Sequence, residues 1–282
     1  MLDWCTSDGK GVEYVSISDR GFQYGDGLFE TVAIRNGEPR LWPYHADRLA
    51  RGCERLGINM PSETALSAGV IHALTHSDAP ATHAVVKIIV SAGVGQRGYG
   101  RTIADAPSTL FRAFPAAPLA LESYQEGIDT IICKTQLATD SPTAGLKTLN
   151  RLEQVLARSE FADSDVFEGL TMDAAGNIIC GTMSNVFFIR DKIISTPSLD
   201  RCGVEGVMRR HIIETLQQRG IATSIQPFAA ANLAHVDEVF ISNSQFGILP
   251  VRSCLQMTWA VGETTQQVMS ILAANGVSEC HL

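Results

Sequence analysis

The sequence predicts a two-domain protein of mixed α+β / α/β class. The chain has 282 residues, about the length of two domains of ordinary size. Apolar, β-branched runs that suit strands alternate along it with segments of helical period. The expected strands outnumber simple β-α-β units, which favours two α+β-like lobes over one doubly wound sheet.

A segment rich in proline and alanine marks the expected domain boundary. It contains Pro115 and Pro118 and shows no clear hydrophobic period, which is typical of a linker. We therefore expect a smaller N-terminal α/β domain at residues 1–114, a linker at 115–120, and a larger C-terminal domain with a mainly β core at 121–282.

Turn and cap residues delimit the elements of the first half. Asn36-Gly37 suits a tight hairpin turn. Pro43 suits the first turn of a helix and Gly57 its end. The elements expected here are a hairpin at 27–42, helices at 43–58 and 63–76, and a strand at 83–92.

The second half has the same mixture of elements without a repeated sequence. Ala175-Gly176-Asn177 marks a tight turn between strands, and Gly220 can end a helix. The expected strands lie at 129–135, within 168–196 and at 237–243, and the expected helices at 150–161, 206–220 and 264–276.

Composition and charge exclude several classes of function. The net charge is −8, with no run of Lys and Arg, so neither a nucleic acid nor a membrane surface is an expected partner. Residues 1–16 lack the pattern of a signal peptide. The seven isolated cysteines fit a reducing cytoplasm. The histidines show no metal-site spacing, so we expect no metal.

Lys147 lies in an apolar stretch, AGLKTLN, just before an expected helix. A lysine amine in such surroundings can lose its proton and form a Schiff base. The alternative is a lysine whose stem covers apolar surface while its ammonium reaches water. Composition alone favours this second interpretation, because exposed lysines are common.

The stretch SAGVGQRGYG matches a dinucleotide fingerprint only in its glycine spacing, because no good helix follows. We interpret it as a flexible loop that presents Arg97 and Tyr99. Arg97 could hold a carboxylate with two parallel hydrogen bonds or could be a solvated turn residue, and the sequence does not decide between them.

Several weaker signals point to an anion. Arg48 could bind a phosphate or lie on a wet helix face. Val207 and Met208 open an expected helix, where free amides suit an anion. Asn243 and Ser244 follow a strand and offer further donors, although an ordinary turn would look the same.

Taken in order, several motifs resemble one family. FQYGDGLFET, HADRL, LKTLNRLEQ, GTMSNVF, GVEGVMR and SNSQFGILPV together resemble the fold type IV pyridoxal phosphate (PLP) enzymes of the class IV aminotransferase family. That family includes D-amino acid and branched-chain aminotransferases and 4-amino-4-deoxychorismate lyase. LKTLNRLEQVLAR, GQRGY and SNSQFGILPV look most like the lyase. The resemblance implies a D-amino acid aminotransferase-like architecture.

The resemblance also implies roles for the candidate residues. Lys147 matches the lysine that holds PLP covalently and later moves protons. Thr31 matches a hydroxyl that helps proton transfer in the lyase. The positions implied in cofactor binding are Arg48, Lys147, Cys180, Val207, Met208, Asn243 and Ser244, and those implied in substrate binding are Arg97, Tyr99 and Tyr24.

Cys180 departs from the family pattern, which usually has a glutamate five residues before the asparagine of SNVF. A carboxylate there keeps the pyridine nitrogen of PLP protonated, whereas a thiol is a weak donor. Transamination needs full carbanion stabilisation, and an early elimination needs less. The departure therefore favours the lyase, and it also suits a divergent enzyme.

The implied activity is a lyase of the carbon–oxygen/carbon–carbon type that eliminates pyruvate from 4-amino-4-deoxychorismate and gives 4-aminobenzoate for folate biosynthesis. A cytoplasmic homodimer is expected with it. The alternatives are a D- or branched-chain amino acid aminotransferase of the same fold, and a decayed, non-catalytic PLP-binding homologue or scaffold, which Cys180 makes more plausible.

Overall fold

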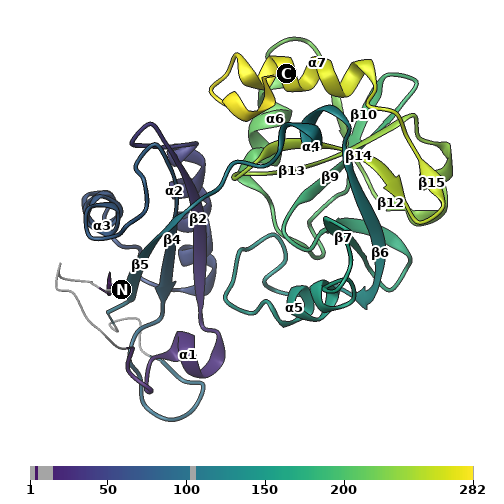
Figure 1. The fold of residues 1–282 in the computed structure, drawn as a ribbon. Coiled ribbons are helices and arrows are strands. Elements are labelled where there is room, and N and C mark those ends of the chain that lie inside the picture. Colours follow the sequence, from purple (N-terminus) through teal and green to yellow (C-terminus); the bar gives the residue numbers. More distant parts are fainter. Residues whose placement is uncertain (1–3, 6–14, 102–105, 282) are drawn as a thin grey trace. The chain divides into compact units, whose positions relative to one another are not determined.

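The computed structural model describes residues 4–5, 15–101 and 106–281, and it contains helices and strands in mixed order (Figure 1). The chain divides into two compact units. The first unit comprises the residues up to Pro118 together with Leu146–Asn150, and the second comprises Leu119–Gly145 and Arg151 onward. The mixed class predicted from the sequence is confirmed, while the domain boundary at 115–120 stays a prediction.

The first unit contains an antiparallel sheet with helices on one of its faces. The strand order among the described residues is β1-β5-β4-β2-β3. The strands are β1 (Trp4–Cys5), β2 (Gly27–Arg35), β3 (Glu38–Pro39), β4 (His83–Ser91) and β5 (Ser108–Pro115). The helices are α1 (Arg20–Tyr24), α2 (Trp42–Leu56) and α3 (Glu63–Thr75).

Local sequence explains how these elements begin and end. Asn36 and Gly37 both have positive φ, 53° and 83°, as the turn of a tight hairpin requires. Pro43 stands in the first turn of α2, and Gly57 caps its end with a φ of 62°. The hairpin and this helix therefore agree with the sequence prediction.

The core of the first unit lies between one face of the sheet and the helices α2 and α3. Alternate residues of the central strands point to this face, because side chains alternate along a strand. The core residues from the sheet include Val32, Ile34, Val86 and Ile88, and those from the helices include Leu49, Cys53, Leu66 and Val70. Burying this apolar face fixes the positions of β2, which carries Thr31, and α2, which carries Arg48.

The second unit is built on one large mixed sheet. Its described strands follow the order β11-β10-β9-β13-β14-β6-β7-β8-β12, with β15 paired to β14. The strands are β6 (Ile128–Gln136), β7 (Glu168–Met172), β8 (Asn177–Gly181), β9 (Asn185–Arg190), β10 (Ile193–Thr196), β11 (Thr223–Ile225), β12 (Phe228–Ala229), β13 (Glu238–Asn243), β14 (Gly247–Cys254) and β15 (Met257–Thr258).

Helices cover parts of this sheet, with α6 and α7 in contact with β13 and α5 in contact with β6 (Figure 1). The α-helices are α4 (Leu121–Gln125), α5 (Leu152–Ser159), α6 (Val207–Gln217) and α7 (Glu263–Ala273), and short 3-10 turns lie at Ala230–His235 and Ser278–Cys280. Within the described part of the chain, none of the helices has the length and apolar character needed to cross a membrane.

Candidate active site

Lys147 is held in place by backbone pairing with strand β2. The Phe29 amide donates a hydrogen bond to the Lys147 carbonyl at 3.0 Å, and the Leu149 amide donates to the Gly27 carbonyl at 2.9 Å. Because β4 pairs with β2 along its whole length, the Lys147 segment must use the other edge of β2. This pairing explains why Leu146–Asn150 belongs to the first unit.

The Lys147 side chain is partly buried rather than fully exposed. Its Nζ lies 4.2 Å from the centroid of the Phe29 ring, within the range of a cation–π contact. Its positive charge is also one of the influences that lower the pKa of His45. Lys147 therefore lies over an aromatic ring, and its charge reaches the buried ionisable cluster that contains His45.

That cluster consists of Glu30, His45 and Arg48, and all three side chains are buried. Glu30 Oε1 accepts a hydrogen bond from Arg48 Nε at 2.8 Å, and Glu30 Oε2 lies 2.6 Å from His45 Nδ1. The second carboxylate oxygen also accepts from Arg48 Nη2. A planar guanidinium held by both oxygens of one carboxylate has a fixed orientation.

The pKa values of the cluster follow from burial and charge. Burial raises the pKa of Glu30, but the charges and hydrogen bonds of Arg48 and His45 outweigh it and lower this pKa to about 2. Burial is the main cause that lowers the pKa of His45, against the opposing effect of Glu30. At neutral pH we therefore assign an ionised Glu30 and a neutral His45 that donates Nδ1–H to it.

His45 Nε2 is buried and has no hydrogen-bond partner among the described residues. A buried polar atom without a partner is costly. Its position on α2, one turn before Arg48, places an unsatisfied ring nitrogen in the same cluster as a buried cation. The cluster thus has the composition of a site for an anionic or hydrogen-bonding group.

Thr31 lies on β2 two residues beyond Phe29. Because side chains alternate along a strand, Thr31 and Phe29 project from the same face of β2. Phe29 is the residue whose ring Lys147 contacts. The Lys147 ammonium therefore lies over Phe29, on the face of β2 from which Thr31 also projects.

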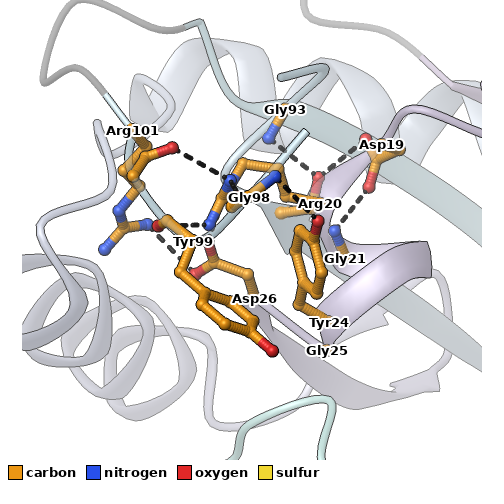
Figure 2. Close-up of polar contacts among 12 residues, drawn as sticks. Asp19, Arg20, Gly21, Tyr24, Gly25, Asp26, Gly93, Gly98, Tyr99 and Arg101 are labelled. Atoms are coloured by element: carbon orange, nitrogen blue, oxygen red, sulfur yellow. Dashed lines mark hydrogen bonds and ion pairs between the residues drawn. The ribbon is translucent and has the colours of Figure 1, made fainter. Parts of the chain in front are cut away.

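The three predicted substrate-binding residues also lie close together in the first unit. The rings of Tyr24 and Tyr99 are 5.4 Å apart and tilted, and the Tyr24 hydroxyl accepts a hydrogen bond from the Gly98 amide at 3.3 Å (Figure 2). Arg97 is exposed. The middle of the Arg97–Tyr99 loop is thus hydrogen-bonded to α1, while the flexibility that the sequence predicts stays a prediction.

Cys180 lies on β8 of the second unit, in an apolar cluster with Cys202 and Leu137. Burial raises the pKa of its thiol to about 11, so the thiol is neutral at physiological pH. Its Sγ lies 3.6 Å from Thr171 Oγ1. Arg151 is near enough for its charge to oppose this rise in pKa slightly.

Helix α6 begins at the buried residues Val207 and Met208. The first amides of a helix have no partner within it, and here the N-cap residue Gly206 supplies no side-chain cap. A Cβ at Gly206 would lie only 2.0 Å from Asn185 Oδ1, so a capping side chain has no room. The start of α6 therefore offers uncapped amides that suit an anion.

Asn243 is the last residue of β13, and Ser244 begins the turn that leads to β14. Asn243 Oδ1 accepts hydrogen bonds from the amides of Gln245 and Phe246 at 2.8 and 3.0 Å. This carboxamide oxygen shapes the turn, which leaves the nearby Ser244 hydroxyl as the better candidate to contact a ligand. Ser244 Oγ accepts from Gln245 Nε2 at 3.2 Å.

Sequence reasoning did not single out Glu30, His45 or Arg20. Glu30 and His45 lie inside the motifs FQYGDGLFET and HADRL. The signal available for them was their residue type, since a carboxylate in a strand that is otherwise apolar needs a buried partner. Arg20 binds the backbone of the Arg97–Tyr99 loop, and no sequence pattern indicated that contact.

Comparisons with known proteins agree on one family. The profile of the amino-transferase class IV family matches residues 27–254. The aminodeoxychorismate lyase of Vibrio harveyi is 33% identical over 240 residues, which cover 84% of this chain and 86% of that protein. The crystal structure of 4-amino-4-deoxychorismate lyase from Pseudomonas aeruginosa has a TM-score of 0.90 and 39% identity, covering 98% of this chain and 100% of that one.

A more distant structure shares the fold alone. The PLP-bound form of a hypothetical aminotransferase from Mycobacterium tuberculosis has a TM-score of 0.83 at 18% identity, covering 99% of this chain and 100% of that one. The predicted fold type IV architecture is confirmed by these structures. With its profile match over most of the sequence and its likeness to two lyases over at least 86% of their length, the chain belongs to the class IV aminotransferase family.

Proposed function

We propose that this protein is a PLP-dependent lyase that converts 4-amino-4-deoxychorismate into 4-aminobenzoate and pyruvate. The observation that carries the proposal is the 39% identity to the lyase of Pseudomonas aeruginosa over 98% of this chain. The reaction would serve the synthesis of folate. An aminotransferase remains the second candidate, because aminotransferases also share the fold.

The residues present fit PLP in most respects. In the first unit the buried Arg48 and the unpartnered Nε2 of His45 suit a phosphate, and in the second unit the uncapped start of α6 does so by itself. The family resemblance assigns the phosphate to Arg48 of the first unit and to Val207, Met208 and Ser244 of the second, and the aldehyde carbon to Lys147. Cys180 is the exception, since it offers a neutral thiol where a carboxylate is usual. When bound, PLP supplies an electron sink for the carbon that bears the substrate nitrogen.

Lys147 is the proposed general base. Its amine would take the proton from the carbon that bears the amino group of the substrate. The bond between the ring carbon and the enolpyruvyl oxygen then breaks, its electron pair stays on that oxygen, pyruvate leaves as its enolate, and the remaining ring becomes aromatic. Lys147 or Thr31 would return a proton to the enol carbon. This pairing of roles is supported by Phe29, whose ring contacts Lys147 Nζ and which projects from the same face of β2 as Thr31.

Arg97, Tyr99 and Tyr24 are the proposed substrate-binding residues. The exposed Arg97 guanidinium suits a carboxylate, and the substrate carries two. We also propose that the protein works as a cytoplasmic homodimer, in which this loop serves the site of the partner subunit. An exposed tyrosine such as Tyr99, 86% accessible in the single chain, is suited to such a role.

Cys180 favours elimination over amine transfer. A neutral thiol, with its pKa raised to about 11, does not hold a proton on the pyridine nitrogen as a carboxylate does. The cofactor would then be a weaker electron sink. Transamination, which must stabilise a carbanion fully, suffers more than a reaction that expels pyruvate early and gains aromaticity.

The experiment supplies purified protein with PLP and 4-amino-4-deoxychorismate, without any amino acid. Pyruvate is followed with lactate dehydrogenase and NADH, and 4-aminobenzoate by its fluorescence. Equal amounts of both products support the lyase. If no pyruvate forms, and L-leucine or D-glutamate instead yields its 2-oxo acid, the protein is an aminotransferase. A protein that performs neither reaction is the non-catalytic homologue.

A further inference from the structure

Arg20 binds three successive carbonyl groups of one loop. Its Nη1 donates to the carbonyls of Gly98 and Gly100 at 3.0 and 3.3 Å, and its Nη2 donates to the carbonyl of Tyr99 at 3.0 Å (Figure 2). Its Nε donates to Asp26 Oδ2 at 2.8 Å. The Arg20 side chain is only 5% exposed, so this cation is buried among acceptors.

Such an arrangement forces an unusual loop shape. In an extended chain successive carbonyls point in opposite directions, so three that converge on one cation require a tight curl. Gly98 has a φ of 107°, in a region that side chains with a Cβ rarely adopt. Glycine at this position and arginine at position 20 therefore cooperate to give one backbone conformation.

The support beneath Arg20 is itself well ordered. Asp26 accepts from Arg20 with one carboxylate oxygen and from Arg101 Nη1 with the other, at 3.1 Å. The Tyr24 ring centroid lies 5.1 Å from Arg20 Cζ. These contacts tie the loop to the short helix α1 and to Asp26 just beyond it.

The helix α1 is capped at both ends. Asp19 Oδ1 accepts from the Gly21 amide at 2.8 Å, and Asp19 Oδ2 accepts from Ser91 Oγ at 2.9 Å. At the other end Gly25 adopts a left-handed conformation with a φ of 66°. Arg20 is thereby fixed to strand β4, which contains Ser91, and is not carried by a loose segment.

While the loop backbone is bound inward, its side chains face outward. Tyr99 is 86% exposed. Arg97 is also exposed. The loop thus presents a guanidinium and a phenol to solvent, while its backbone carbonyls are bound by Arg20.

We propose that Arg20 is a positioning residue for substrate recognition: it fixes the direction in which Arg97 and Tyr99 meet a carboxylate-bearing substrate. This inference rests on the proposed function, in which these two residues bind the substrate. A recognition element that is already ordered loses less conformational entropy on binding, so its affinity is higher. Arg20 itself touches only protein groups.

The first test measures the loop and does not depend on turnover. Trypsin cleaves after Arg97, and cleavage requires the loop to open. In Arg20→Lys a single ammonium replaces the planar fork and cannot reach four acceptors, so we expect cleavage after Arg97 to accelerate about 10-fold or more. The control Arg51→Lys, at an exposed ion pair with Asp47, should cleave like the wild type. Unchanged cleavage in Arg20→Lys overturns the proposal.

The second test is a double-mutant cycle in steady-state kinetics. Arg20→Lys should raise KM for the substrate about 10-fold and change kcat and bound PLP much less. If Arg20 acts through Arg97, the same change in an Arg97→Ala background should cost less than about 2-fold in kcat/KM. Full additivity of the two changes, or a loss of kcat and PLP with an unchanged KM, contradicts a positioning role.

A backbone variant repeats the test without touching Arg20. Gly98→Ala strains the loop at a φ of 107°, although an added Cβ would meet no atom within 4 Å. Gly276→Ala is its matched control, with positive φ and open space far along the chain. We expect faster trypsin cleavage after Arg97 and a higher KM in Gly98→Ala alone. If the wild type shows no lyase activity, the proposed function fails, while the cleavage results still decide whether Arg20 orders the loop.

Discussion

Glu30 holds Arg48 through both of its carboxylate oxygens in the interior of the first unit. The pair joins β2 to α2, and His45 shares the same carboxylate. Because Glu30 fixes the plane of the guanidinium, it determines which direction Arg48 can face when it binds an anion. Glu30 is therefore a determinant of the proposed phosphate site although it would repel the phosphate itself.

We predict that Glu30→Gln lowers the free energy of unfolding by about 3 kcal/mol, because it leaves the buried cation of Arg48 without its counter-charge. Urea denaturation followed by circular dichroism measures this loss. Asp47→Asn is the matched control, since Asp47 lies on the same helix and forms an exposed ion pair with Arg51. That change should cost less than about 1 kcal/mol. Equal losses in the two variants would refute the special role of the buried pair.

The low pKa of Glu30 predicts a loss of stability in acid. Its folded-state pKa is about 2 against an ordinary value of 4.5. Below pH 4.5 the unfolded chain binds a proton that the folded chain does not, so stability falls progressively as the pH drops toward 2. The contribution that is lost amounts to about 3 kcal/mol.

Urea titrations at a series of pH values test this expectation. Between pH 4.5 and about pH 2, the free energy of unfolding of the wild type should fall more steeply with falling pH than that of Glu30→Gln, which lacks the titrating carboxyl. If both proteins show the same slope, Glu30 is not the residue responsible, and other carboxylates such as Asp129, whose hydrogen bond from Arg252 lowers its pKa to about 2, must explain the loss.

Lys147→Ala should abolish turnover, and Lys87→Ala should not. Both ammonium groups lie over the Phe29 ring, at 4.2 and 5.1 Å from its centroid, so the two variants remove the same kind of contact. Borohydride reduction of the PLP-loaded wild type should fix the cofactor to the peptide that contains Lys147, as identified by mass spectrometry. A label on any other lysine rules out the assignment.

Arg97→Ala should weaken substrate recognition while PLP binding stays intact. The expected change is a rise in KM of about 100-fold, since one bidentate pair to a carboxylate is lost. Arg112→Ala, another exposed arginine of the first unit, should leave KM unchanged. An unchanged KM in Arg97→Ala, or a parallel loss of PLP absorbance, would remove Arg97 from the substrate site.

Cys180→Glu should shift the balance toward amine transfer. A carboxylate there would favour a protonated pyridine nitrogen, and the nearby Arg151 charge would reduce the cost of burying it. We expect faster conversion of the cofactor to its amine form by amino acids, relative to pyruvate release, in stopped-flow absorbance. Cys202→Ser, in the same apolar cluster, is the control and should not change that ratio.

The sequence predicted features that depend on local chemistry. Pro43 and Gly57 delimit α2, and Asn36-Gly37 turns the hairpin, because caps and turns are set by a few adjacent residues. The family resemblance rested on motifs along most of the chain and is confirmed by the comparisons.

The features that the sequence could not show are contacts between distant residues. Arg20 meets the loop nearly 80 positions later in the chain, and Glu30 meets Arg48 only because β2 packs against α2. The contact of Lys147 with the Phe29 ring was equally hidden, since the two residues are far apart in the sequence. The roles of the site residues stay predictions until the variants above are measured.

Strand β14 occupies the centre of the large sheet, between β13 and the parallel strand β6. It is translated more than 110 residues after β6, so the nascent chain has to close a long loop before the two halves of that sheet meet. Until Gly247–Cys254 leaves the ribosome, β6 and β13 each keep an unpaired edge. Premature termination before this strand would thus yield an aggregation-prone fragment rather than a shorter working protein.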